Sequence, residues 1–314
     1  MRNFHLLIIS CCLSCQPQAQ ENKSRTGNNE SSIVTESTPD KPDLVKIDTI
    51  PDIKQGTDER SPAFIKKRLE DLVGKFLKGK CTENGITYPP KFVLFRFFKY
   101  EKEFEVWAGN SRNDSLCRIL FLEVCAVDEV PGTKLREGDG KTPEGFYNST
   151  LLYGSGFDFM WIKLNNKEID AYGSANKGSS FKICLDYPNS IERQRTKTLL
   201  KTKSPGGAIC IHGNCVTAGC ISFENKNFLP VFLAALGHDS KTYGAVKIHI
   251  FPFRFNQLSD QEKESFAKNA GNMSKDQVLA LWTNLEVAYN LFEKNRKAIK
   301  ILIANNKEYL FQQF

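Results

Sequence analysis

Residues 205–225 of this 314-residue chain have the sequence PGGAICIHGNCVTAGCISFEN. The apolar residues at 208–211 predict a short buried strand, and the glycines at 213 and 219 bound a loop whose backbone can approach other groups closely. His212 ends this strand, and Cys220 follows the loop. An imidazole that folds back onto a thiol makes it a strong nucleophile near neutral pH, so the stretch predicts a reactive cysteine. A loop that packs a buried cysteine beside an incidental histidine is the alternative.

The chain has ten cysteines, and three of them lie within the first fifteen residues. The other seven are at positions 81, 117, 125, 184, 210, 215 and 220. In an exported protein these seven form up to three disulfides, and Cys220 is the natural residue to stay unpaired. We expect Cys215 to pack or to form a disulfide. A zinc set of His212, Cys215 and Cys220 is an alternative use, although spacings of three and five residues match no zinc-finger pattern.

The first fifteen residues, MRNFHLLIISCCLSC, combine a basic Arg2 with a short apolar run and a cysteine cluster. This order predicts a signal peptide over residues 1–15, because a membrane span needs about 20 apolar residues. The end of the stretch resembles a bacterial lipoprotein signal, which predicts lipidation of Cys15, with Cys11 as the rival acceptor. A plain cleaved signal, or an N-terminus without an export role, is the alternative. Residues 16–60 are polar and too poor in large apolar side chains to fold, so we expect a flexible tether.

The net charge of +7 arises from 43 basic and 36 acidic residues. Such a balance favours an acidic partner, which includes carboxylate-rich polymers, anionic surfaces and nucleic acid. The basic residues are dispersed and no nucleic-acid motif is present, so we expect no nucleic-acid partner. The glycine-rich segment 130–150 lacks the glycine spacing and the following helix of a phosphate-binding loop. We therefore predict neither a cofactor nor a resident metal.

The pattern along the chain predicts an α+β fold. Residues 61–90 hold an N-terminal helix and a connector, and residues 91–98 and 104–108 predict a β-hairpin. The β pattern continues over 116–127, and further short strands are predicted at 157–164, 171–172 and 180–185.

The remainder predicts a helix at 228–236 and a strand at 245–253. Alternation along that strand puts His249 on the polar side of a sheet, so we interpret it as structural, and His238 as a surface residue. Capping boxes at Ser259 and Ser274 predict two helices, the second long and amphipathic. A terminal β-hairpin over about 299–311 completes the fold.

The segment 185–207, LDYPNSIERQRTKTLLKTKSPGG, is basic. Its Arg193 and Arg195 are candidates for binding a substrate carboxylate, because a guanidinium group holds a carboxylate through two hydrogen bonds. A solvated basic loop is the alternative.

Three blocks together resemble the YkuD-type L,D-transpeptidase family, and specifically its YafK-like branch. They are KTPEGFYN at 141–148, LDYPN at 185–189 and IHGNCVTAGCISF at 211–223. The resemblance implies a mixed β-sandwich catalytic domain with peripheral helices, which we place at 91–255. Residues 281–293 look like the C-terminal extension of that branch, so 256–314 is predicted to be a helical extension with a terminal hairpin.

The resemblance also implies a reaction. The cysteine of the family attacks the amide carbonyl at the third residue of a peptidoglycan stem peptide, usually a diaminopimelate. By this resemblance Cys220 is the nucleophile and His212 is its general base or ion-pair partner. The carbonyl of Gly213 orients the imidazole, and backbone N–H groups at Gly219 and Cys220 form the oxyanion hole. An amine or water then resolves the acyl-enzyme.

The sequence departs from the main family pattern at two places. Ala218 replaces a second histidine, and Ser222 replaces an arginine or asparagine. The missing second histidine and the shortened gap between His212 and Cys220 both fit the YafK-like branch, which includes a hydrolase that releases a lipoprotein from peptidoglycan. The acceptor therefore stays open between an amine and water, and a lipoprotein that keeps the fold without the chemistry is a further alternative. The expected partners are stem peptides and a wall-attached lipoprotein. The expected location faces the periplasm, with membrane contact only through the lipid anchor.

Overall fold

A computed structural model describes residues 66–67, 69–153, 181–201, 204–213, 215–271, 273–305 and 307–314 of the chain. The predicted leader and tether, the start of the N-terminal helix, and the strands predicted at 157–164 and 171–172 lie outside these residues. Within the described part, helices that are both long enough and apolar enough to span a bilayer are absent.

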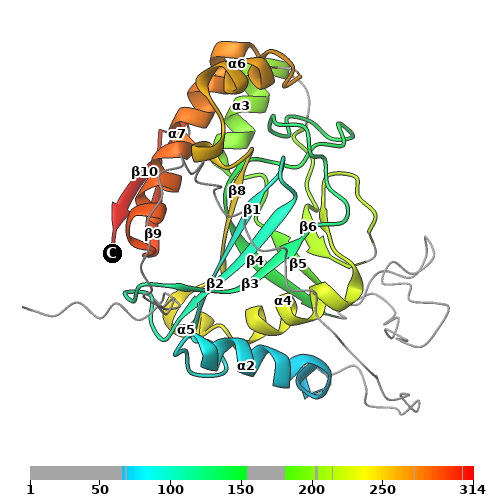
Figure 1. Ribbon diagram of the computed structural model, residues 1–314. Helices are drawn as coiled ribbons and strands as arrows, with labels where there is room; N and C mark the ends of the chain where they lie inside the picture. The colour runs from blue at the N-terminus through cyan, green and yellow to red at the C-terminus, as the bar shows by residue number, and fades with distance from the viewer. Residues whose placement is uncertain are drawn as a thin grey trace, which may run out of the picture. The chain divides into compact units, whose positions relative to one another are not determined.

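Eight strands form one curled mixed sheet in the order β3-β2-β1-β8-β4-β5-β6-β7 (Figure 1). The hairpin predicted around residue 101 is formed by β1 and β2, which pair antiparallel. Two pairs, β1 with β8 and β6 with β7, are parallel. The α+β class is thereby confirmed. The strands are β1 (Phe92–Phe98), β2 (Glu103–Gly109), β3 (Cys117–Glu123), β4 (Gly145–Tyr153), β5 (Phe181–Leu185), β6 (Cys210–His212), β7 (Ile221–Ser222) and β8 (Lys247–Phe251).

One face of the sheet packs against the N-terminal helical segment and a central helix. Alternation along the strands points Phe95 of β1 and Ile248 of β8 into this first core, which also contains Leu77 and Phe232. The covering elements are the π-helical turn η1 (Glu70–Gly74), α2 (Lys75–Glu83) and α4 (Asn225–Gly237). The helix predicted at 228–236 is therefore confirmed as part of α4.

The opposite face carries a second core, formed with the C-terminal elements. Phe92 and Phe251 project from the sheet and pack with Trp282, Tyr289 and Phe292 of α7. Both predicted capping boxes are present. The predicted C-terminal helix and hairpin are thus confirmed. The elements are α6 (Asp260–Lys268), α7 (Lys275–Asn295), β9 (Ile299–Ala304) and β10 (Glu308–Gln313), after the short α5 (Ser240–Tyr243) and η2 (Phe255–Gln257).

The polar side predicted for His249 and the surface position predicted for His238 are both wrong. His249 is 1% exposed, because the face on which alternation places it is covered by the second core and is not polar. His238 is also buried: its Nδ1 accepts a hydrogen bond from the Val93 N–H, and its Nε2 lies 3.0 Å from the Gly244 carbonyl. Nε2 must then carry the ring proton and donate a hydrogen bond to that carbonyl. His238 is a structural residue of the interior.

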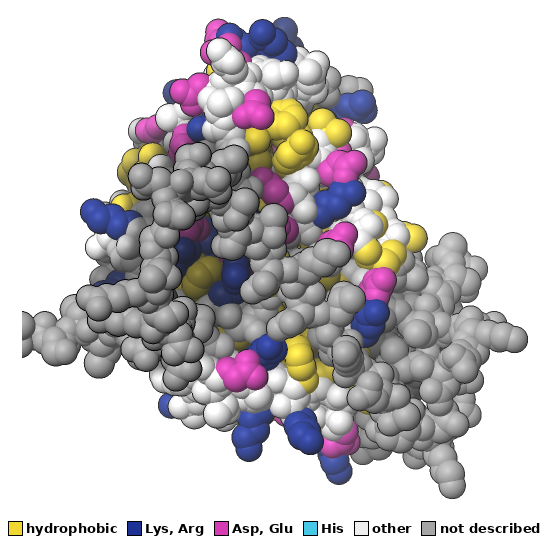
Figure 2. All heavy atoms as spheres, viewed as in Figure 1, with side chains coloured by type: hydrophobic (Ala, Val, Ile, Leu, Met, Phe, Trp, Pro, Cys, Tyr) yellow, Lys and Arg dark blue, Asp and Glu magenta, His cyan; other side chains and the backbone are white. Residues whose placement is uncertain are grey.

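The basic segment after β5 folds as helix α3 (Ser190–Leu200) and is not a loop. The Asn189 side chain caps the start of this helix, and the Asn189 N–H donates in return to the Glu192 carboxylate. This capping box is a signal for a helix start, and it was present in the sequence. On the face drawn in Figure 2, acidic and basic side chains of the described residues are interspersed. This agrees with the dispersed basic residues of the sequence.

Candidate active site

The pairing of β6 with β7 sets the positions of the two predicted catalytic side chains. Ile211 lies opposite Ile221, and His212 opposite Ser222. Both isoleucines belong to the first core, so their neighbours in the chain point to the other face of the sheet. Cys220 directly precedes β7, and its Sγ accepts a hydrogen bond of 3.4 Å from the Cys210 N–H. Cys220 and His212 are therefore diagonal neighbours on one face, with about 8 Å expected between such Cα positions from ordinary strand spacings.

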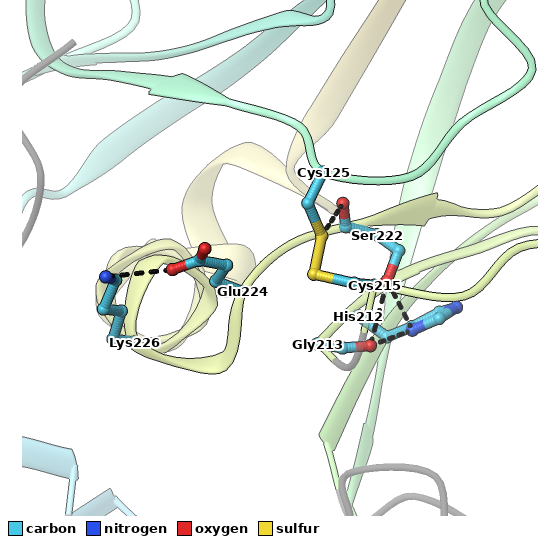
Figure 3. Close-up of a disulfide and its surroundings, with 7 residues drawn as sticks. All are labelled: Cys125, His212, Gly213, Cys215, Ser222, Glu224 and Lys226. Atoms are coloured by element: carbon cyan, nitrogen blue, oxygen red, sulfur yellow. Dashed lines mark hydrogen bonds and ion pairs between the residues drawn. A yellow bond between two sulfur atoms is a disulfide. The ribbon is translucent and has the colours of Figure 1, made fainter.

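The imidazole of His212 is buried and oriented by its neighbours. Its Nδ1 lies 2.5 Å from the carbonyl oxygen of Gly213. Ser222 Oγ donates to the same carbonyl at 3.0 Å and lies 3.5 Å from Nδ1 (Figure 3). A carbonyl only accepts hydrogen bonds, so Nδ1 must carry the proton, and Nε2 is the basic nitrogen. Gly213 thus lies where the sequence resemblance implies.

The surroundings favour the neutral forms of both groups. Burial lowers the pKa of His212; the bond to Gly213 acts in the opposite direction, and the nearby Lys182 lowers it further. Burial raises the pKa of the Cys220 thiol, against the smaller effects of the Cys210 N–H and of Lys182 and Lys134. A neutral thiol beside a neutral imidazole suits general-base catalysis better than a preformed ion pair.

Two disulfides surround the site and leave Cys220 with a free thiol. One joins Cys125 to Cys215 and ties the loop after His212 to the segment after β3 (Figure 3). The other joins Cys184 of β5 to Cys210 of β6. In the described part of the chain two disulfides form where up to three were expected, and Cys220 is unpaired as expected.

The zinc alternative fails on the same observation. The sulfur of Cys215 is bonded to Cys125 and so cannot serve as a thiolate ligand. Within the described ranges, groups of three or more residues of the types His, Cys, Asp and Glu placed to hold a metal ion are absent.

Gly219 fits the loop because it has no side chain. Its φ is +117°, and a Cβ at this position would lie 2.7 Å from the carbonyl oxygen of Lys141. The block at 141–148 therefore packs directly on the residue before Cys220. The Gly219 N–H donates to Thr217 Oγ1 at 3.0 Å, and that hydroxyl donates to the Cys220 carbonyl at 2.6 Å. The predicted oxyanion donor is thus engaged within its own loop in this structure.

A buried carboxylate anchors the same block. Glu144 is fully buried and accepts hydrogen bonds from Lys99 Nζ at 3.1 Å, from the Gly132 N–H at 2.6 Å and from Trp282 Nε1 at 2.8 Å. Lys99 also donates to the Thr142 carbonyl. Glu144 thereby connects the wall of the candidate site to the end of β1 and to α7.

The charged groups that act on the Cys220 thiol are Lys182 and Lys134, and neither candidate arginine is among them. Arg193 is exposed on α3. Arg195 lines a cavity of about 580 Å³ between α3, α7 and β10, whose lining does not include Cys220 or His212. The described structure therefore brings Cys220, His212, Gly213 and Gly219 together but does not place either arginine with them. Cys11 and Cys15 lie outside the described residues.

Two residues near the site were missed from the sequence. Ser222 was interpreted only as a departure from the family pattern, yet it lies between the Gly213 carbonyl and the imidazole. The position of Lys182 beside His212 follows from the pairing of β5 with β6. Ile183 lies opposite Ile211, so the preceding residue of β5 lies next to His212. Both relations depend on strand pairing, which the local sequence does not reveal.

The fold and the three sequence blocks define a chain that is similar to the L,D-transpeptidases of the YafK type, and comparison with known proteins confirms this resemblance. The chain is 24% identical over 217 residues to the protein named "Putative L,D-transpeptidase YafK" of Escherichia coli strain K12, an alignment that covers 68% of this chain and 72% of that protein. The protein of the same name from Escherichia coli O157:H7 gives the same values. No family model matches the chain.

Solved structures also match, among them these two. The helical cell shape determining protein Pgp2 of Campylobacter jejuni is 17% identical, with a TM-score of 0.34 over 75% of this chain and 86% of that one. Bd1075 of Bdellovibrio bacteriovorus is 15% identical, with a TM-score of 0.31 over 70% of this chain and 79% of that one. Values this low carry neither an activity nor a substrate from those proteins to this chain.

Proposed function

We propose that this chain is a cell-wall enzyme that transfers acyl groups of peptidoglycan stem peptides through a thioester on Cys220. The observation that carries the proposal is the pairing of a free thiol with an oriented, neutral imidazole on one face of the sheet. The similarity to YafK supplies the class of substrate.

In the proposed reaction His212 Nε2 takes the proton of the Cys220 thiol as the sulfur attacks the carbonyl carbon of the third stem residue. The Nδ1 proton stays against the Gly213 carbonyl, which stabilises the imidazolium that forms. As the tetrahedral intermediate collapses, the imidazolium protonates the leaving amine and a thioester remains. An acceptor amine or water then attacks the thioester, with His212 again as the base, and the thiol is restored.

The negative oxygen of the intermediate requires donors, and one well-placed donor stabilises it by about 3 kcal/mol. The backbone N–H groups at Gly219 and Cys220 are the proposed donors. Because Thr217 Oγ1 accepts from Gly219 N–H, substrate must displace this hydroxyl before that N–H can serve. We propose this displacement as part of substrate binding.

The proposed location is outside the cytoplasm, facing the periplasm, with an anchor at Cys15 or Cys11. Two disulfides support an oxidising compartment, because such bonds are rare in reducing ones. The leader supports export through the membrane. Mass spectrometry of the protein purified from membranes tests this: a diacylglyceryl mass on one of these cysteines is expected, and an unmodified N-terminus contradicts the anchor.

The test of the activity is incubation of the purified protein with muropeptides, followed by chromatography and mass spectrometry. Wild type is expected to yield new crosslinks or shortened stem peptides, and Cys220→Ala is expected to yield neither. Cys117→Ala serves as the matched control, because Cys117 lies in neither disulfide and is on β3, away from the site. Identical products from wild type and Cys220→Ala would refute the proposal and favour a lipoprotein without chemistry.

The same reaction run in H₂¹⁸O identifies the acceptor. Hydrolysis places one ¹⁸O atom in the new carboxylate of the product. Transfer to an amine gives an unlabelled product whose mass is that of the donor plus the acceptor minus the amine released in the first step. A further experiment supplies peptidoglycan with an attached lipoprotein as the substrate. Hydrolysis of that linkage would release the lipoprotein.

A further inference from the structure

A second cavity lies against the C-terminal hairpin, separate from the cysteine site. Its volume is about 230 Å³, and its lining comes from β4, β8, β9, β10, α5, the connection between β2 and β3, the segment between β5 and α3, and the C-terminal Phe314. Neither Cys220 nor His212 lines it. In the sheet order β8 and β6 are separated by β4 and β5, so the two sites belong to different parts of the sheet.

His249 is the most buried polar group of this cavity. It is 1% exposed, and neither of its ring nitrogens has a hydrogen-bond partner among the described residues. Its ring meets Phe146 edge-on at 4.9 Å. Burial lowers the pKa of His249 to about 3, and the nearby Arg96 and Lys247 lower it as well. The ring is therefore neutral and offers one donor and one acceptor, both of which are costly to leave unpaired in the interior.

Arg112 adds a second unsatisfied donor to the same cavity. Its Nε is buried and has no hydrogen-bond partner in the described part of the chain. Its guanidinium group stacks on the ring of Phe314, 3.9 Å from the centroid. Lys247 also lines the cavity and donates to Asn148 Oδ1 at 2.6 Å. With Lys300, three cationic residues therefore line this space, which favours an anion.

The carboxylate among the lining residues is already engaged. Asp186 accepts hydrogen bonds from the backbone N–H of Asn148 at 2.8 Å and from its side-chain amide at 2.6 Å. From β9 the lining includes the apolar side chains of Ile299, Ile301 and Ile303 as well as Lys300. The cavity thus offers a cationic end and an apolar side, in a volume smaller than the pockets of drug-sized ligands.

We propose that this cavity binds a small organic carboxylate whose anionic end contacts Arg112 and His249 and whose apolar body lies along β9. The guanidinium group supplies donors that match a carboxylate, and the neutral imidazole supplies one more. The ligand would satisfy the buried groups that the protein itself leaves without partners.

Calorimetric titration of the full-length protein with benzoate tests the proposal. Benzoate is expected to bind at one site per chain, and benzamide, which has the same shape without the charge, at least tenfold more weakly. Arg112→Gln is expected to weaken benzoate binding at least tenfold. Arg136→Gln is the matched control, because Arg136 is exposed and lines neither cavity. Cys220→Ala is expected to bind benzoate as wild type does, which separates this site from the cysteine site.

His249→Phe provides a readout that a structural role would not give. It removes two unpartnered nitrogens, so the thermal midpoint without ligand is expected to rise, while the upward shift caused by benzoate is lost. A fall in that midpoint together with retained benzoate binding would overturn the proposal. So would equal affinities for benzoate, benzamide and inorganic phosphate, or unchanged benzoate affinity in both the Arg112 and His249 variants.

Discussion

The Glu144 carboxylate gives a sharp test of how the wall of the candidate site is held. Glu144→Gln keeps the size of the side chain and removes its charge. Lys99, which is fully buried, then loses its buried charged partner, and the nearest remaining carboxylate is Asp128 at 3.7 Å, beside neutral oxygen acceptors that include the Gly132 and Thr142 carbonyls. Removing one member of a buried ion pair typically costs 3–5 kcal/mol, and because Asp128 compensates in part we expect a loss of about 3 kcal/mol.

Urea unfolding followed by tryptophan fluorescence measures this loss. With an m-value of about 3 kcal/mol/M, the midpoint is expected to fall by about 1 M. Glu137→Gln is the matched control: it makes the same change on an exposed residue of the same segment and is expected to leave the midpoint in place. The double variant Lys99→Met, Glu144→Gln is expected to lose less than the sum of the singles, by roughly 1–3 kcal/mol. A midpoint shift below about 0.3 M for Glu144→Gln would refute the claim that the buried Lys99–Glu144 ion pair stabilises the fold. Strictly additive losses for the two single variants would refute it as well.

Three further predictions concern protonation and the orientation of the base. Because the pKa of Cys220 is raised, its alkylation by iodoacetamide should be slower at pH 7 than that of a small solvent-exposed thiol and should still rise above pH 9; a rate that is already maximal at pH 7 would indicate an ion pair instead. The pKa of His249 is about 3 when folded and about 6.5 when unfolded, so the unfolded state binds more protons between these values. The unfolding free energy should therefore fall by up to about 1.4 kcal/mol per pH unit below pH 6.5, and His249→Phe should flatten this slope. Ser222→Ala removes a bond to the Gly213 carbonyl worth about 1 kcal/mol, so kcat on muropeptides should fall roughly five- to tenfold with KM little changed; an unchanged kcat would show that Ser222 does not position His212.

Local patterns were enough for elements whose signal lies within a few residues. The aromatic and β-branched runs around residue 101 predicted the β1–β2 hairpin, and Ser274 with Gln277 predicted the start of α7. The same kind of signal at Asn189 and Glu192 was overlooked, because the basic residues that follow suggested a solvated loop. α3 was therefore missed.

Relations between distant segments could not be predicted in this way. Alternation placed His249 on one face of β8 correctly in principle, but it does not reveal that α7 and the hairpin cover that face. The Glu144 carboxylate accepts hydrogen bonds from Lys99, Gly132 and Trp282, which come together only in the folded chain. The spacing of His212 and Cys220 suggested a pair, whereas their common face follows from the parallel register of β6 and β7.

The measurement that tests the central claim most directly is the intact mass of the protein after rapid acid quenching with a tetrapeptide muropeptide. The account predicts an added mass equal to the acyl part of the substrate, located on the peptide that contains Cys220. This adduct should be absent in Cys220→Ala and should form far more slowly in His212→Gln, whose side chain cannot take the proton at neutral pH. A product that forms at the wild-type rate without any covalent adduct, or an adduct on a residue other than Cys220, would contradict the account.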